Sequence, residues 1–152
     1  PLSSFKLSPS PKKILKPNNT PKNILFNTAT NPPPPDGSLP IISAISKLHK
    51  DLYALGKKLP KRDRFGIHTK IENLCLECFE LAIEAALSPR IEKRSIIKCL
   101  HIKVTVVKHL IRAEQELSIL TPKIYFNLSE LLVEISKMAA GWLRYAEKGE
   151  QL

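Results

Sequence analysis

The sequence predicts an all-α protein, an antiparallel up-down-up-down four-helix bundle with a disordered Pro-rich N-terminal tail. Two observations predict this class. Ten of the 13 prolines lie within the first 40 of the 152 residues, and this density excludes helix interiors and central strands there. Beyond residue 40, apolar residues recur at helical spacing in four runs, and no run keeps the period-two alternation of a strand.

The tail is predicted to span residues 1–40 and the bundle residues 41–148. Five lysines and a single acidic residue, Asp36, make the tail basic. Pro32–Pro35 predict a short polyproline II segment, and Asp36-Gly37 a turn. We interpret the tail as a disordered linker. The alternatives are a basic arm on nucleic acid and a ligand for a proline-binding groove.

Three prolines separate the four predicted helices. Pro60 divides a first helix, about 41–58, from a second, about 64–87. The third helix follows Ser88-Pro89, and the fourth follows Thr121-Pro122, a favourable N-cap and first-position pair.

The apolar spacing predicts how these helices pack. A period near 3.5 is typical of left-handed, nearly antiparallel packing, and short connections make consecutive helices neighbours. The predicted core stripes are Ile41, Ile45, Leu48, Leu52, Leu55 and Leu59; Ile67, Ile71, Leu74, Cys78, Leu81 and Ala85; Ile97, Leu100, Val104, Val107 and Ile111; and Ile124, Leu128, Leu131, Ile135, Met138 and Trp142.

Charge and composition narrow the function. The net charge of +10 and the pI near 9.7 indicate an acidic partner, such as nucleic acid or a membrane surface. No apolar run is long enough to span a membrane, and we expect no secretory signal. Three cysteines without a disulfide-framework spacing favour a reducing cytoplasm, so we expect a cytoplasmic protein.

A basic stripe follows one face of the third predicted helix. Its residues are Arg94, Lys98, His101, Thr105, Lys108 and Arg112, with Arg90 one turn earlier. The stripe is about 27 Å long, and Glu92 and Glu114 lie off it. Neighbouring like charges repel by a few tenths of a kcal/mol per pair. Nucleic-acid phosphates could offset that cost, as could acids of another subunit or of the second helix. Those acids are Glu77, Glu80 and Glu84. An ordinary solvated face remains the alternative.

A second basic cluster occupies the turn before the second helix. It comprises Lys57, Lys58, Lys61, Arg62 and Arg64. The candidate nucleic-acid-binding residues are therefore Arg90, Arg94, Lys98, His101, Lys108 and Arg112, together with Lys61, Arg62 and Arg64. We expect Phe65, Tyr125 and Phe126 to pack in the core. Binding would then be dominated by backbone contacts and weakly sequence-specific.

Signals of catalysis are weak. Cys75 and Cys78 form a Cys-x-x-Cys motif in mid-helix, away from the helix N-terminus that activates redox thiols. Cys99, His101 and His109 complete no known zinc spacing. We therefore interpret Cys75 and Cys78 as buried structural thiols.

Other enzyme motifs are missing from the sequence. The carboxylate pairs Glu72/Glu80 and Glu130/Glu134 lack the Glu-x-x-His motif of di-iron bundles, and no histidine has a carboxylate at a compelling spacing. The sequence has no Gly-rich phosphate loop and no Gly-x-Ser-x-Gly elbow. We expect no catalytic residue, metal or cofactor.

Three segments carry a family resemblance. They are Leu59–Ile67 (LPKRDRFGI, followed by Lys70-Ile71-Glu72), Leu110–Leu117 (LIRAEQEL) and Glu134–Trp142 (EISKMAAGW). Residues 44–146 thereby resemble the accessory variability determinant (Avd-like) four-helix-bundle proteins of diversity-generating retroelements.

The resemblance implies a basic, non-enzymatic homo-oligomer, pentameric in the family. Such a protein partners a reverse transcriptase, binds RNA or an RNA/DNA hybrid, and assists mutagenic retrohoming. Arg112 and the other basic residues of the third helix match the positively charged surface of the family. Met138, Gly141 and Trp142 match its fourth-helix signature as packing residues.

Two alternatives remain open. One is a stand-alone oligomeric interaction bundle, related to the ribosomal-RNA intervening-sequence proteins, whose Pro-x-x-x-Arg-Phe-Gly turn is similar. The other is a metal or redox helical enzyme built on Cys75, Cys78 and Cys99.

Overall fold

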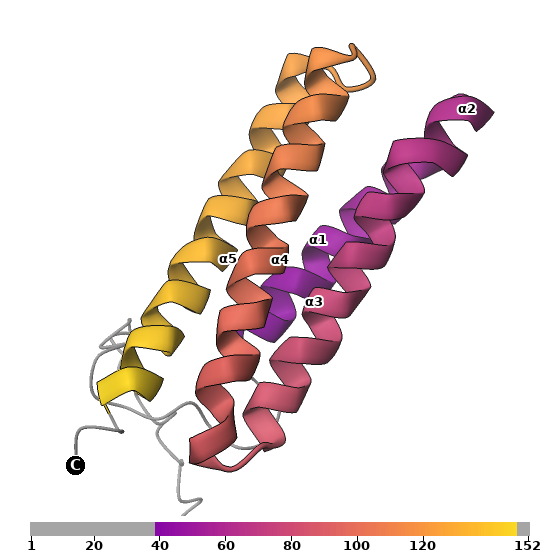
Figure 1. Cartoon of the computed structure of the whole chain (residues 1–152). Coiled ribbons are helices and arrows are strands. Elements are labelled where there is room, and N and C mark those ends of the chain that lie inside the picture. Colours follow the sequence, from indigo (N-terminus) through magenta and orange to yellow (C-terminus); the bar gives the residue numbers. More distant parts are fainter. Residues whose placement is uncertain (1–38, 149–152) are drawn as a thin grey trace, which may run out of the picture.

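The structure, a computed structural model, describes residues 39–148. The predicted tail therefore lies outside the described residues, apart from Leu39 and Pro40. The described part of the chain is helical and contains no strand, which confirms the all-α class (Figure 1). Its elements are α1 (Pro40–Gly56), α2 (Lys61–Asp63), η1 (Arg64–His68), α3 (Thr69–Leu87), α4 (Arg90–Glu116) and α5 (Pro122–Lys148). None of these helices is long and apolar enough to cross a membrane.

Proline marks the start of each long helix except α3. Helix α1 begins at Pro40, α4 directly after Pro89 and α5 at Pro122, because the fixed φ of proline suits a first turn that needs no N–H donor. The expected cap of the last helix is present, since the backbone N–H of Ile124 donates to Thr121 Oγ1 at 3.3 Å.

The end of α4 is a Schellman motif. The N–H of Ile119 donates to the carbonyl of Glu114, and the N–H of Ser118 donates to Gln115, as the motif requires. Ser118 has a φ of 60°, a left-handed conformation that usually belongs to glycine. This turn sends the chain back into α5.

Helix α3 is preceded by a π-helical turn, η1, where a regular helix is predicted. The short α2 leads into it, and Gly66 has a φ of −94° and a ψ of −115°, outside helical values. The Thr69 hydroxyl donates to the Arg64 carbonyl at 2.6 Å and so closes the widened turn. The second predicted helix thus begins earlier, at Lys61, and changes type before α3.

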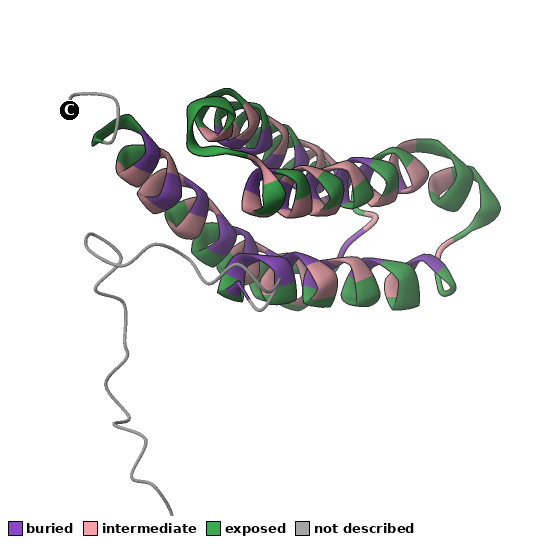
Figure 2. Ribbon diagram, turned by 90° about the horizontal axis from the view of Figure 1, so that it is seen from below, coloured by how far each residue is buried: buried purple, intermediate pink, exposed green. Residues whose placement is uncertain are grey.

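The four long helices form a ring of contacts. Helix α3 packs on α4, α4 packs on α5, and α1 packs on both α3 and α5 (Figure 1). Buried residues follow the inward sides of the helices (Figure 2). On α1 and α4 the predicted stripes form the core, although Leu55 and Leu59 are only half-buried.

Two predicted stripes were wrong in part. The buried positions of η1 and α3 are His68, Ile71, Leu74, Cys75, Cys78, Ala82 and Ala85, and those of α5 are Leu128, Leu132, Ile135, Ala139, Trp142 and Ala146. Five residues of the predicted stripes are half-buried instead: Ile67, Leu81, Ile124, Leu131 and Met138. Small residues such as Ala82 and Ala139 face the interior because they let neighbouring helices approach.

Candidate nucleic-acid interface

The basic stripe of α4 lies on the flank that faces α5. Arg94 Nε is 3.9 Å from Glu147 Oε1 of α5, and the Arg90 guanidinium lies 5.8 Å from the centre of the Tyr145 ring. His101 is half-buried, and the other candidate residues of α4 are exposed. The stripe thus lies on the α5 side of α4, and most of its cationic residues are exposed.

Acidic residues of the same chain form ion pairs with only some of the basic residues of this stripe. Arg112 Nε donates to Glu116 Oε1 at 2.9 Å, one turn along α4. Exposed pairs of this kind contribute about 0–1 kcal/mol, so a phosphate can displace the carboxylate. Lys98 and Lys108 have no ion pair within the described part of the chain. Their charges are available to an external anion.

The acids of the second predicted helix do not neutralise the stripe. Glu77 of α3 forms an ion pair with Lys103, on the flank of α4 that faces α3. The hydrogen bond from Lys103 lowers the pKa of Glu77. Glu80 and Glu84 are exposed on α3. The electrostatic cost of the stripe is therefore not offset by these three carboxylates.

The turn between α1 and η1 carries the second basic cluster, and two aromatic side chains predicted for the core, one in η1 and one in α5, are exposed instead. Lys57, Lys58, Lys61, Arg62 and Arg64 are all exposed. Phe65 is 70% exposed and Phe126 59% exposed, so the expectation that they pack in the core was wrong. Tyr125 is half-buried against the core.

The basic stripe and the contact with η1 lie on different flanks of α4. Glu114 contacts η1, whereas Arg112 precedes it by two residues, which is about 200° of rotation around the helix. The stripe consequently points away from η1. The structure brings the residues of each cluster together but does not join the two clusters into one face.

A buried ion pair anchors the basic turn to the bundle. His68 and Glu114 are both 0% exposed. His68 Nδ1 lies 2.8 Å from Glu114 Oε1 of α4, and His68 Nε2 lies 2.8 Å from the Leu52 carbonyl of α1. Both partners are acceptors, so the imidazolium, which donates from both nitrogens, satisfies this geometry.

The surroundings of His68 favour its charged form. Burial alone would lower the pKa of His68, but the hydrogen bonds to Glu114 and Leu52 and the nearby carboxylate of Glu72 raise it above the ordinary value of 6.5. Glu72 Oε1 is 3.7 Å from Nε2. Glu114 Oε2 is buried without a hydrogen-bond partner in the described chain, which makes this a costly as well as a specific contact.

Sequence reasoning missed this pair. The expectation that no histidine pairs with a carboxylate was wrong, because His68 and Glu114 are far apart along the chain and meet only through packing. A signal did exist. Glu114 lies three residues after Ile111, the last predicted core residue of α4. His68 lies three residues before Ile71, a predicted core residue of α3. Both polar residues therefore occupy core positions of their helices.

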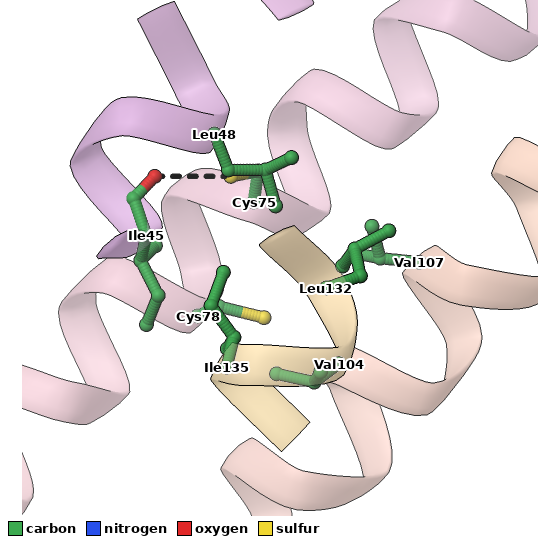
Figure 3. A pocket seen from close by; sticks show the side chains of 8 residues that line it. All are labelled: Ile45, Leu48, Cys75, Cys78, Val104, Val107, Leu132 and Ile135. Carbon is green, nitrogen blue, oxygen red and sulfur yellow. Dashed lines mark hydrogen bonds between the residues drawn. The ribbon is translucent and has the colours of Figure 1, made fainter. Parts of the chain in front are cut away.

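The cysteines of the Cys-x-x-Cys motif are buried, as predicted. Burial raises the pKa of Cys75 and of Cys78 to about 12, so both remain thiols at neutral pH. Both line an apolar cavity of about 10 Å³ at the centre of the bundle (Figure 3), and Cys75 Sγ lies 3.7 Å from the Ile45 carbonyl. Buried thiols in such surroundings are poor nucleophiles and poor metal ligands.

Metal-ligand geometry is also lacking in this part of the protein. Within residues 39–148, no group of three or more His, Cys, Asp or Glu side chains is placed to hold a metal ion. Cys99 is exposed on α4, whereas Cys75 and Cys78 are buried.

Comparison with known families identifies the bundle. A family model described as bAvd-like matches residues 41–146, more than half of the chain. The chain belongs to the bAvd-like family. Comparison with curated proteins and with solved structures gave no significant match. The family assignment agrees with the resemblance found in the three sequence segments.

The bAvd-like region contains all nine candidate residues. It begins within α1 and ends two residues before the end of α5, so the basic stripe, the basic turn and the buried ion pair all belong to it. The candidate interface is therefore part of the bAvd-like bundle.

Proposed function

We propose that this bAvd-like protein is a non-enzymatic, nucleic-acid-binding accessory subunit that partners a reverse transcriptase in diversity-generating retroelement mutagenic retrohoming. The exposed stripe of α4 carries the proposal. Lys98 and Lys108 lie on it without an ion pair in the described chain, and its spacing suits successive phosphates of RNA or an RNA/DNA hybrid. Family membership supports the reverse-transcriptase partner.

The proposal includes an assembly. The ring of helix contacts and the short connections favour an up-down-up-down bundle, and we propose that copies of it form a homo-oligomer, a pentamer by family resemblance. Exposed apolar side chains on the outer side of α4 favour such an interface. These are Ile91, Ile102 and Val106. The same observation favours the second candidate, a stand-alone oligomeric interaction bundle.

Charge reversal tests the nucleic-acid surface. The variant Lys98→Glu/Lys108→Glu/Arg112→Glu should weaken RNA binding and reduce the slope of log K against log salt by about two to three. The control Lys50→Glu/Lys137→Glu/Arg144→Glu changes the net charge equally at exposed positions of α1 and α5. The assigned surface would be wrong if both variants lost the same affinity for RNA, or if neither variant lost any.

Two further measurements separate the candidates. Light scattering of the stripe variant reports the oligomer, which should persist if the stripe binds nucleic acid and dissociate if it contacts another subunit. Co-expression with a retroelement reverse transcriptase and its template RNA should yield a complex that survives purification. Failure to co-purify, with the oligomer intact, would favour the stand-alone bundle.

A further inference from the structure

We infer that the turn between α1 and η1 is a second nucleic-acid contact, which holds single-stranded segments by stacking a base on Phe65. This inference rests on the proposed function, since it names the form of nucleic acid that one part of the protein binds. The candidate residues are Phe65, Arg64, Arg62, Lys61 and Lys57.

Phe65 has the geometry of a stacking platform. Its side chain is 70% exposed, although exposing an aromatic ring to water costs free energy that burial would recover. The Arg64 guanidinium lies 5.4 Å from the centre of the ring. A base that lies against the exposed ring recovers the lost apolar contact, and every base has a π face.

Charge around the ring suits the phosphates of the same strand. Residues 57–64 include five basic residues and one acidic residue, Asp63, and the basic ones are exposed. Lys57 Nζ lies 5.0 Å from the ring centre of Tyr53, which is itself 53% exposed. Aromatic faces beside cations are the combination that sequence-tolerant single-strand binding sites use.

The platform is held rigidly. Phe65 lies in the π-helical turn η1, and η1 ends at His68, whose ring bonds to α1 and α4 at once. The Thr69 hydroxyl fixes the Arg64 carbonyl. Because these contacts fix the backbone on the C-terminal side of Phe65, a base that stacks there meets a ring whose backbone is already ordered.

The inference distinguishes this turn from the α4 stripe. Bases in a duplex are already stacked on one another, so a duplex offers phosphates but no free base face. The stripe of α4 is dominated by basic side chains and contains no aromatic residue other than the half-buried His101. We therefore assign phosphate contact with either form of nucleic acid to the stripe, and preference for unpaired bases to the turn.

Fluorescence anisotropy tests this assignment with three probes of one length. They are a 12-nucleotide oligouridylate, an abasic strand with the same number of phosphates, and a 12-base-pair RNA duplex. The wild-type protein should bind oligouridylate about tenfold more tightly than the abasic strand. Phe65→Ala should abolish that preference and leave duplex affinity within about twofold, whereas Phe65→Trp should retain the preference.

A matched control removes an aromatic ring elsewhere. Phe126→Ala deletes a ring of similar exposure on α5 and should keep the tenfold preference. Circular dichroism verifies that each variant is folded, which we expect because Phe65 buries little surface.

Three results would overturn the inference. If the wild type binds abasic and normal strands equally, or if Phe65→Ala keeps the preference, the turn is not a stacking site, while binding by the α4 stripe still stands. If the wild type binds none of the three probes, the proposed function itself fails and the inference with it.

Discussion

His68 donates a hydrogen bond from Nδ1 to Glu114 Oε1 at 2.8 Å, with both side chains fully excluded from solvent. Through Nε2 the same ring also donates to the Leu52 carbonyl. One imidazolium therefore ties η1 to both α1 and α4. Because a buried ion pair adds little net stability but is satisfied in few arrangements, we expect this contact mainly to fix the register of these segments.

Removing one partner of this pair should be severely destabilising. Glu114→Leu leaves a buried imidazolium without its counter-ion and should lower the free energy of unfolding by about 3–5 kcal/mol. The double variant His68→Leu/Glu114→Leu removes both charges and should lose much less. Urea denaturation at one fixed protein concentration measures both. A double variant as unstable as the single one would show that packing shape, not charge, dominates this site.

The stability of the protein should depend on pH through His68. Its pKa is raised in the folded state because the hydrogen bonds to Glu114 and Leu52 and the carboxylate of Glu72 outweigh the opposing effect of burial. The stabilisation that comes from protonated His68 is fully present below the unfolded pKa of about 6.5. It is lost as pH rises through the folded pKa.

The comparison with His68→Gln isolates that contribution. The stability advantage of the wild type over His68→Gln should shrink as pH rises from about 6 through the folded pKa of His68. Urea denaturation across this range measures the difference. An advantage that is constant, or that grows with pH, would contradict the charged state of His68.

Replacing two glycines with alanine should change the stability of the protein in opposite directions. A Cβ at Gly56 would lie 3.0 Å from His68 Cδ2 and 3.2 Å from Glu72 Oε1, and the buried ring cannot move away. Gly56→Ala should therefore destabilise by about 1–3 kcal/mol. A Cβ at Gly141, within α5, meets nothing within 4 Å, so Gly141→Ala should stabilise by about 0.5–1 kcal/mol. Thermal unfolding distinguishes the two, and destabilisation by both would contradict the packing around Gly141.

Replacing Ser118 with glycine should stabilise the protein. Its φ of 60° costs a residue with a Cβ roughly 1 kcal/mol, so Ser118→Gly should raise the free energy of unfolding by about that amount. The control Ser95→Gly, at an exposed interior position of α4, should lower it by a few tenths of a kcal/mol. Denaturant midpoints measure both changes. A destabilised Ser118→Gly variant would argue against the Schellman turn.

The three thiols should react at different rates. Cys99 is exposed, whereas Cys75 and Cys78 are buried, and their raised pKa values further suppress the thiolate. Titration with a chromogenic disulfide reagent should give one fast thiol per chain and two that react only after denaturation. Cys99→Ser should remove the fast phase. Fast reaction of more than one thiol would contradict the burial of the Cys-x-x-Cys motif.

The sequence predicted the parts of the fold that depend on local patterns. Pro89 and Pro122 mark helix starts because proline lacks the N–H donor that a helix interior requires. The five apolar core residues of α4, from Ile97 to Ile111, were all predicted because they keep one regular helical spacing, whereas the buried Glu114 was missed. The apolar residues of α5 form two neighbouring stripes, and either stripe could face the core. Contact with the other helices determines that Leu132 and Ala139 are buried.

By itself, then, the sequence determined the helical class, the positions of the turns and the presence of two basic clusters. Tertiary structure decided that His68 meets Glu114, that Phe65 is exposed, and that the basic stripe of α4 points away from η1. The reason is physical. Periodicity records how residues are arranged around one helix, whereas contacts between helices depend on rotations and offsets that no single helix contains.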